Sequence, residues 1–389
     1  MFSALKLPQS LPGRGLALAA VLFLSACDPT STASNGPSID TGAAVPVALL
    51  VPGGEGGDAV VSRSLENAAR LAIADLQGVN IDLRVYPTGG SAGGATGAAN
   101  QAAEDGAKIL LGPLYSEAAN AAGHAVASRG LNVLSFSNNA SIAGGNVFVL
   151  GNTFDNTADR LVSYAASKGK GKIFVINAQS TAEEIGRDAI VRAISGSRAS
   201  LAGNASFELS QQGIASAIPT IAAQVQSTGA QSVFFTSDNA GAMPFLAQML
   251  PENGVSSASN QFIGLARLDI PSEALSQPGL QGAWLALPDP ALNNNFNSRY
   301  ASAYGSAPHP LAGLAYDGIA AIGALVGKGK SDALTRTALT QGSGFVGVSG
   351  IFRLRSDGTN QRGLAVGQIQ NNRVTVIDPA PKSFGGFGF

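Results

Sequence analysis

The stretch KILLGPLYSEAANAAGHAVASRGLNVLSFSNNAS, residues 108–141, contains a complete strand–helix–strand unit. KILLG at 108–112 and LNVLSF at 131–136 are short apolar runs that are typical of buried strands. The Ala-rich segment between them predicts a helix that begins at Ser116. Two strands joined through a helix by short links are parallel, and their crossover is right-handed. This unit therefore indicates an α/β fold.

The same alternation of strands and helices continues on both sides of this unit. Before it, we predict strands at 45–51 and 81–86 and helices at 64–77 and 95–104. A second series has strands at 172–177, 207–210, 231–237 and 261–264, with helices at 183–194, 214–226 and 242–250. Helices at 294–304 and 311–326 and strands at 350–355, 362–369 and 373–378 follow. About 340 residues in two such series exceed the size of a single core, so we expect two domains.

The composition excludes several classes of function. Charged residues make up 13% of the chain, whereas about 25% is usual for soluble domains. No cluster of basic residues could neutralise a phosphate backbone, so we expect no nucleic-acid partner. One cysteine and two histidines cannot form a disulfide framework or a closed zinc site. We therefore expect no metal and no cofactor.

The N-terminus has the features of a targeting segment. Lys6 and Arg14 precede an apolar run at 16–24, which is too short to span a bilayer. The order Leu-Ser-Ala-Cys, which ends at Cys27, resembles a bacterial lipobox. This resemblance implies a signal peptide at 1–26 and lipidation of Cys27, and hence a periplasmic protein anchored to a membrane. The alternative is an ordinary secretory signal followed by a chance cysteine.

The residues on either side of the body are expected to lack regular structure. Residues 27–44 are small, polar and interrupted by proline, which predicts a flexible tether. Asp28 resembles the signal that retains lipoproteins at the inner membrane of enteric bacteria, so this membrane is favoured over the outer one. Residues 379–389 form a predicted tail.

Several blocks of the chain resemble the Leu/Ile/Val-type periplasmic binding proteins. These blocks are VPVALLV at 45–51, the opening stretch, VFVLGNTFDNTADRLVSYAASKGKGKIFVI at 147–176 and GVSGIFRLRSDGTNQRGLAVGQIQNNRVTVI at 347–377. The resemblance implies a type I periplasmic-binding fold of two lobes, each a parallel sheet flanked by helices, joined by three hinge crossovers. One lobe would comprise 45–155 and 288–340, and the other 156–287 and 341–378. Ligands of such proteins lie between the lobes, which close by hinge motion.

The ligand residues that this resemblance implies lie at the carboxyl ends of two strands. Ser116 begins a helix after one strand, where unpaired N–H groups favour an anion. Ser137, Asn138 and Asn139 follow the next strand, at the edge where open α/β sheets bind ligands. In amino-acid receptors of the family, the matching groups hold the ligand carboxylate. The alternative is that Ser116 caps its helix and the asparagines shape a turn.

The second lobe departs from the amino-acid receptors of the family. Ala182 stands where these receptors carry an aromatic residue, and Ala266 stands where they carry an acid for the ligand ammonium group. Asp238 could replace this acid, or it could cap the helix that we expect to begin at Ala240. A carboxylate site without a partner for the ammonium group does not specify an α-amino acid.

The segment VLSFSNNAS at 133–141 and the block at 147–176 look more like penicillin-binding-protein activators, which are lipoproteins that regulate peptidoglycan synthases. Our leading hypothesis is therefore regulation of a penicillin-binding protein through protein contact. The alternative is the substrate-binding protein of an ABC importer for amino-acid-like or amide solutes, with a permease as partner. A sensor that binds a ligand and signals to a membrane partner is a third possibility.

An enzyme is not expected. Residues 167–170 fit S-x-x-K and residues 237–239 spell S-D-N, a pair found in penicillin-binding enzymes. That chemistry needs the serine at a helix start, whereas Ser167 is expected at a helix end, and the chain has no K-T-G. We therefore predict no catalytic residue.

Overall fold

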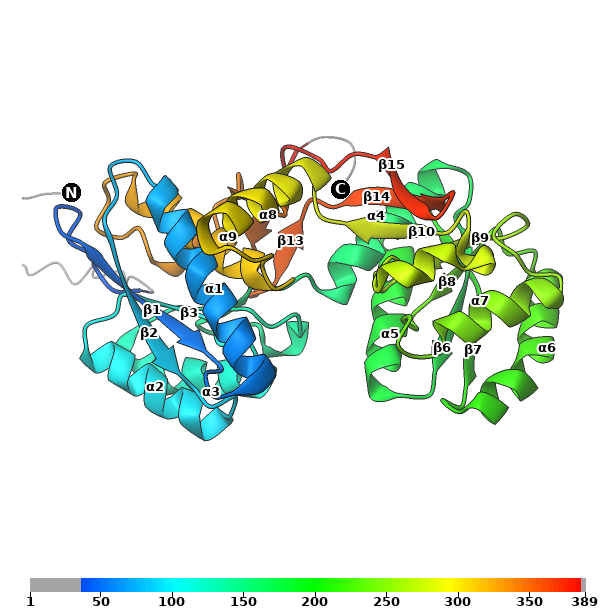
Figure 1. The fold of residues 1–389 in the computed structure, drawn as a ribbon, viewed down its shortest axis with the longest axis horizontal. Helices are drawn as coiled ribbons and strands as arrows, with labels where there is room; N and C mark the ends of the chain where they lie inside the picture. The colour runs from blue at the N-terminus through cyan, green and yellow to red at the C-terminus, as the bar shows by residue number, and fades with distance from the viewer. Residues whose placement is uncertain (1–35, 386–389) are drawn as a thin grey trace, which may run out of the picture. The chain divides into compact units, whose positions relative to one another are not determined.

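The structure, a computed structural model, describes residues 36–385 and has two lobes, each built around one open sheet (Figure 1). The α/β two-lobe fold with parallel sheets flanked by helices is the one that the sequence predicts. Within the described residues, no helix is both long enough and apolar enough to cross a membrane.

The first lobe contains a five-stranded parallel sheet in the order β2-β1-β3-β4-β5. Its strands are β1 (Val45–Val51), β2 (Ile81–Pro87), β3 (Ile109–Leu111), β4 (Val133–Ser135) and β5 (Val147–Val149). Its helices are α1 (Gly56–Asp75), α2 (Ala92–Glu104), α3 (Ser116–Val126), α8 (Pro290–Tyr304), α9 (Ala312–Val326) and α10 (Arg336–Leu339), with short 3₁₀ helices η1 (Ala127–Arg129) and η2 (Ala140–Ile142).

Helices α1 and α9 pack against each other over the core of this lobe. In α1 the buried side chains Leu65, Ala68, Ala69 and Ala72 recur at the spacing of one helical face. Most residues of α9 are buried, because it is apolar all round. Small residues in α9 allow this close packing: a Cβ at Gly323 would lie 2.4 Å from the Leu76 side chain.

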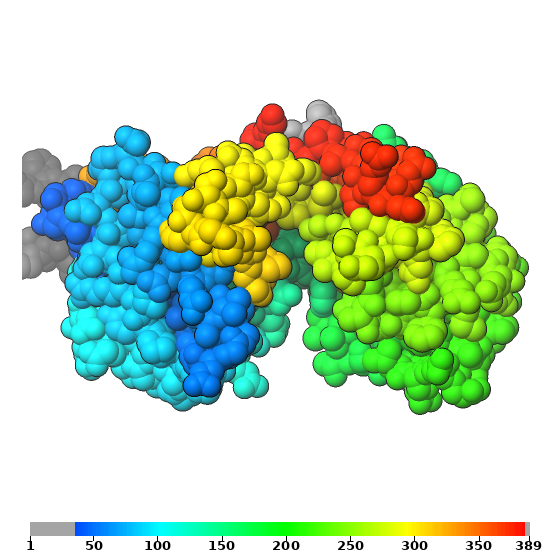
Figure 2. Space-filling model, in the orientation of Figure 1, coloured from blue at the N-terminus to red at the C-terminus, as the bar shows by residue number. Residues whose placement is uncertain are grey.

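The second lobe contains a seven-stranded sheet in the order β15-β14-β10-β9-β8-β6-β7. The five strands from β10 to β7 are parallel, whereas β14 and β15 are antiparallel additions at one edge. Figure 2 shows β15 (Arg373–Asp378), in red, on the surface. The other strands are β6 (Lys172–Ala178), β7 (Ser200–Phe207), β8 (Ser232–Phe235), β9 (Gln261–Gly264), β10 (Trp284–Leu287) and β14 (Ala365–Gln370). The helices are α4 (Phe154–Ser167), α5 (Thr181–Ser195), α6 (Gln211–Thr228), α7 (Met243–Glu252), η3 (Ser272–Ser276) and η4 (Pro278–Leu280).

A third, antiparallel sheet changes the predicted division of the chain. It consists of β11 (Phe345–Gly347), β12 (Gly350–Leu354) and β13 (Asn360–Arg362). Phe345, Phe352 and Leu354 are buried in the core of the first lobe, whereas Leu364 is buried with the second. The last crossover therefore lies between β13 and β14, and not near residue 341, because the apolar faces of β11 and β12 pack with the first-lobe core.

The strand predicted at 207–210 is displaced in the structure. β7 covers Ser200–Phe207, and Ser210 caps α6 by accepting a hydrogen bond from the N–H of Gly213 at 3.0 Å. β7 is an edge strand and most of its residues are exposed or half-buried. No apolar run therefore marks it in the sequence.

The ordered body extends beyond both of its predicted ends. Within the predicted tether, Ile39 is 4% exposed and its N–H donates to the carbonyl of Ser331 at 2.9 Å. Within the predicted tail, Ala380 is buried and the Arg353 guanidinium lies 4.7 Å from the centre of the Phe384 ring. Single apolar residues in polar segments thus dock on the lobes, which a flexible tether and a frayed tail do not anticipate.

Candidate functional site

A cavity of about 620 Å³ is lined by residues of both lobes and of the crossovers. This volume lies within the range of small-molecule binding sites. The first lobe contributes the segments after β3 and β4, and the second lobe contributes Leu265, Arg267, Ile270 and Ala286. The cavity is therefore where open α/β sheets bind ligands, at the carboxyl ends of their strands.

Four of the predicted ligand residues line this cavity together: Ser116, Ser137, Asn138 and Asn139. They meet because β3 and β4 are neighbouring parallel strands, so the segments that follow them share one edge of the sheet. The structure thus brings these four residues to one wall of the cavity. Their role toward a ligand stays a prediction.

The hydroxyl of Ser116 does not cap α3. The residue at the N-cap position is Tyr115, and its side chain makes no capping hydrogen bond. Within residues 36–385, the Ser116 hydroxyl and the Asn138 amide make no hydrogen bond, and both side chains face the cavity as half-buried or exposed groups. They are available to a ligand.

Ser137 and Asn139, in contrast, support the local backbone. The Ser137 hydroxyl accepts a hydrogen bond from the N–H of Asn139 at 3.1 Å, and Asn139 Oδ1 accepts one from the N–H of Ser141 at 3.0 Å. Asn139 is the N-cap of η2. Asn139 therefore shapes a turn, as the alternative interpretation of the sequence expects. It also lines the cavity wall.

Tyr115 is a cavity residue that the sequence analysis did not select. Its hydroxyl donates to Asp58 Oδ1 at 2.6 Å. This hydrogen bond to a carboxylate raises the pKa of the Tyr115 hydroxyl. Tyr115 therefore lines the cavity while its hydroxyl donates to Asp58.

Asp238 does not line the cavity. Its Oδ1 accepts hydrogen bonds from the N–H groups of Ala240 at 3.1 Å and Gly241 at 2.8 Å, in the turn before α7. The proposed replacement for the missing acid is thus directed to its own backbone, as the capping alternative expects. The helix itself begins at Met243, after this turn.

The carboxylate of Glu183, which accepts a hydrogen bond from Ser237 beside Asp238, is also bound by groups of its own lobe. Its Oε2 accepts hydrogen bonds from the N–H of Ala178 at 2.6 Å and from the hydroxyls of Thr236 and Ser237, both at 2.8 Å. These contacts tie the start of α5 to the ends of β6 and β8. Glu183 therefore stabilises the second lobe.

Of the residues that the structure describes, Arg267 is the one charged residue that the second lobe contributes to the cavity wall. Its Nε and Nη2 donate to the two carboxylate oxygens of Asp269 at 2.6 and 2.5 Å. Among the described residues, nothing accepts a hydrogen bond from its Nη1. Arg267 directly follows Ala266, the position where the acid is missing, but nothing in the sequence shows that its side chain lines a cavity.

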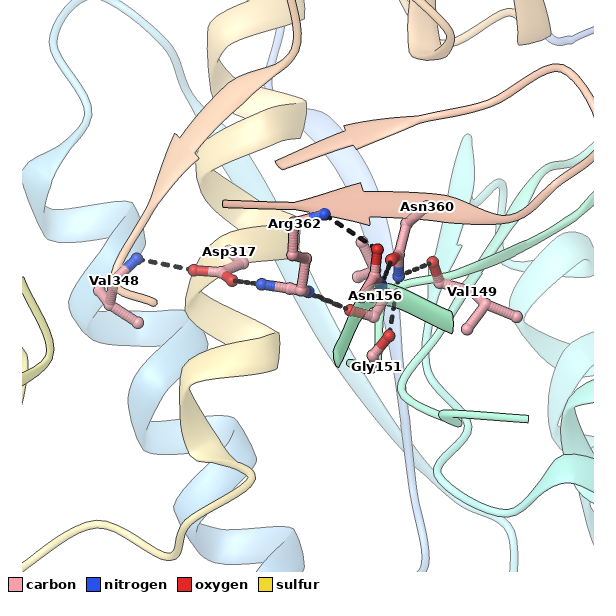
Figure 3. A network of polar contacts seen from close by, with 8 residues as sticks. Val149, Gly151, Asn156, Asp317, Val348, Asn360 and Arg362 are labelled. Carbon is pink, nitrogen blue, oxygen red and sulfur yellow. Dashed lines mark hydrogen bonds and ion pairs between the residues drawn. The ribbon is translucent and has the colours of Figure 1, made fainter. Parts of the chain in front are cut away.

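Arg362 adds a second guanidinium to the cavity wall and belongs to a buried network at the crossovers (Figure 3). Its Nε and Nη2 donate to the carbonyl of Leu150 at 2.9 and 2.5 Å, and its Nη1 donates to Asp317 Oδ2 at 2.9 Å. Asp317 Oδ1 accepts from the N–H of Val348 at 2.7 Å. A Cβ at position 347 would lie 2.1 Å from Asp317 Oδ1, so this contact requires Gly347.

Two asparagines extend this network across the chain crossovers. Asn156 Oδ1 accepts from the N–H of Arg362 at 3.2 Å, and Asn156 Nδ2 donates to Asn360 Oδ1 at 2.5 Å. Asn360 Nδ2 donates to the carbonyls of Val149 and Gly151 at 2.7 and 2.8 Å. The network thus links β5, α4 and β13, which flank the first and last crossovers.

Burial raises the pKa of the Asp317 carboxyl, while the Arg362 guanidinium and the N–H groups of Val348 and Ser349 oppose this rise. Every strong acceptor in the network has a donor, as buried polar groups require. In the part of the chain that the structure describes, no three His, Cys, Asp or Glu side chains could hold a metal ion. Cys27 lies outside the described residues.

Comparisons with known proteins place this geometry in context. Residues 44–373 match the family model described as periplasmic binding protein. No curated protein matches the chain significantly.

Solved structures share the fold at low sequence identity. A protein from Rhodospirillum rubrum, assigned to a branched-chain amino acid ABC transporter, is 19% identical with a TM-score of 0.73, over 86% of this chain and 100% of its own. A branched chain amino acid ABC transporter periplasmic ligand-binding protein from Burkholderia xenovorans LB400 is 17% identical with a TM-score of 0.69, over 88% of this chain and 97% of its own. A solute binding protein of an ABC transporter from Rhodopseudomonas palustris BisB5, in complex with 3,4-dihydroxybenzoic acid, is 16% identical with a TM-score of 0.57, over 88% of this chain and 98% of its own.

Proposed function

Because the chain belongs to the periplasmic binding protein family, whose members are extracytoplasmic solute-binding proteins and not enzymes, we propose that it is the substrate-binding protein of an ABC importer. The observation that carries this proposal is the cavity of about 620 Å³ with unused polar groups in its wall. The proteins of similar fold from R. rubrum and B. xenovorans, assigned to branched-chain amino acid transport, support it.

The first lobe makes the initial contact with the solute in this proposal. The Ser116 hydroxyl and the Asn138 amide donate to an acceptor group of the ligand, since neither is used within the described structure. Ser137 and Asn139 hold the loop that presents Asn138. Binding at one lobe followed by hinge closure onto the second is the motion that this fold supports.

The proposed membrane attachment completes this function. Cys27, acylated at the start of the mature chain, would keep the receptor close to a permease, with the inner membrane favoured by Asp28. Mass spectrometry of the protein from a membrane fraction tests the anchor. The expected mature chain begins at Cys27 and carries acyl chains, and an unmodified cysteine would contradict the lipid anchor.

A second candidate function is the regulation of a penicillin-binding protein through protein contact. It is favoured by one observation: Asp238 and Glu183 bind their own lobe, and the described cavity wall contains no carboxylate for an amino-acid ammonium group. A body that acts through protein contact does not need that group.

Calorimetric titration of the mature protein distinguishes these two functions. The importer proposal predicts saturable binding of a small solute, which Ser116→Ala weakens because a ligand hydrogen bond is lost. Ser141→Ala is the matched control, because this exposed serine lies outside the cavity and its hydroxyl makes no hydrogen bond among the described residues. No binding of any solute, together with capture of a peptidoglycan synthase whose polymerisation rate changes, would overturn the importer proposal in favour of the activator.

A further inference from the structure

The charges around the cavity are strongly one-sided. In the described structure, the cavity wall contains two arginines, Arg267 and Arg362, and no aspartate or glutamate. The remaining polar groups of the wall are hydroxyls and amides, and apolar side chains cover much of it. A ligand in this cavity therefore meets positive charge and hydrogen-bond donors, with no carboxylate to pair with a cation.

Three acids outside the cavity wall accept hydrogen bonds from side chains that line it. Asp58 accepts from the hydroxyl of Tyr115 at 2.6 Å. Asp269 accepts from Arg267 at 2.6 and 2.5 Å, and Asp317 accepts from Arg362 at 2.9 Å. In every case the partner that lines the cavity is the donor. None of these three carboxylates lines the cavity wall itself.

Arg267 is placed to contact the ligand from the second lobe. The Nε and Nη2 of Arg267 donate to Asp269, and no described residue accepts a hydrogen bond from the Nη1 of Arg267. The Arg267 side chain is 38% exposed and lines the cavity, so the Nη1 edge is accessible to a ligand. Arg362 is different, because its side chain is 4% exposed and is fixed by Leu150 and Asp317.

We propose that the cavity selects carboxylic acids that lack an ammonium group, and that Arg267 is the residue that sets this selectivity. The inference rests on the proposed solute-binding function. A buried ammonium group would have no carboxylate partner in the described wall, and uncompensated buried charge is costly. A carboxylate or another acceptor gains charge-assisted hydrogen bonds from the free Nη1 edge. Phe136, Leu265, Leu287 and Leu311 surround the apolar body of such a ligand.

Matched ligands test the selectivity directly in the unmodified mature protein. We would titrate leucine, 4-methylpentanoate, 3-methylbutylamine and benzoate by calorimetry. The first three share one branched carbon skeleton and differ in their charged groups. The expected result is that 4-methylpentanoate or benzoate binds at least about tenfold more tightly than leucine, and that the amine does not bind.

A charge reversal then tests the role of Arg267. Arg267→Glu should lower the affinity for the carboxylate by about tenfold to a hundredfold, and Arg267→Gln should lower it less. The matched control is Arg187→Glu on α5, because Arg187 also pairs with a neighbouring aspartate, Asp188, and lies outside the cavity. This control should leave the affinity unchanged. Circular dichroism and the Tm verify that all three variants are folded.

Each other outcome overturns the inference in a recognisable way. Leucine or the amine binding as tightly as 4-methylpentanoate would refute the selectivity and leave the solute-binding function intact. Carboxylate binding that is unchanged in Arg267→Glu would refute only the role of Arg267 and leave the selectivity of the cavity intact. If none of the four probes binds while a neutral solute does, the selectivity fails, and if no solute of any kind binds, the proposed function fails with it.

Discussion

Two Arg–Asp pairs contact the same cavity and differ in burial. The Arg362–Asp317 pair has side chains that are 4% and 0% exposed, whereas those of Arg267–Asp269 are 38% and 13% exposed. The buried pair needs further partners, and it has them in the Leu150 carbonyl and the Val348 N–H, because removing two charges from water is costly. The exposed pair leaves one guanidinium edge unused. The same chemistry thus supports the fold in one place and is available to a ligand in the other.

The largest expected effect on stability comes from removing the carboxylate of Asp317. Asp317→Ala leaves the Arg362 guanidinium buried without its carboxylate, which should lower the free energy of unfolding by about 3–5 kcal/mol. Asp269→Ala is the matched control, because loss of a partly exposed pair should cost less than about 1 kcal/mol. Urea denaturation measures both. Equal losses in the two variants would show that burial does not separate the pairs.

A smaller loss is expected from the asparagines that connect the network to the crossovers. Asn360→Ala leaves the carbonyls of Val149 and Gly151 and the amide of Asn156 without their partner, which should cost about 1–3 kcal/mol. Asn138→Ala, in the cavity wall, should change stability by less than about 0.5 kcal/mol, since its amide is unbonded in the described structure. A similar loss in the two denaturation curves would contradict a structural role for the network.

Loss of the partly exposed Arg267–Asp269 pair should change the affinity for a ligand and hardly change the free energy of unfolding. Asp269→Ala frees the Nε and Nη2 of Arg267, which should raise the affinity for a carboxylate by a few-fold and increase its dependence on salt. Titration of benzoate at low and high ionic strength measures this. Weaker binding in the variant would instead mean that Asp269 orients Arg267 for the ligand.

The smallest effect is expected from His309, in the loop beside the cavity residue Pro310. Burial lowers the pKa of His309 from its usual 6.5, and its Nδ1 accepts from the N–H of Leu311 at 3.2 Å. The unfolded chain therefore takes up this proton at a higher pH than the folded chain. The corresponding part of the stability is present above pH 6.5 and is lost as the pH falls from 6.5 through the lowered pKa.

His309→Asn should remove this part of the pH dependence, because the asparagine oxygen can accept from Leu311 and does not titrate. Denaturation between pH 7.5 and about pH 5 measures it. An unchanged pH profile in the variant would assign the titration to another group.

Much of the fold was predictable because its elements carry local signals. The strands at 45–51, 261–264 and 373–378 have the boundaries expected from their apolar or β-branched runs. β7 was misplaced because an edge strand needs no apolar run. The family resemblance implied that residues 341–378 belong to the second lobe, whereas apolar side chains of β11 and β12 pack in the first-lobe core. Ser116 and Ser137 were found from their positions after strands, whereas Arg267 and Arg362 were not, because nothing local shows which arginine faces a cavity.

The sequence by itself determined the order of strands and helices, the edge at which the predicted ligand residues of the first lobe gather, and the absence of an acid at Ala266. These properties depend on local periodicity and on the rule that parallel strands end at one edge. Only the tertiary structure decided that Asp238 binds its own backbone, that Asp317 neutralises Arg362, and that Arg267 pairs with Asp269 in the cavity wall. The direction of a charged side chain is set by partners that are distant in sequence and by burial, and neither is present in a local pattern.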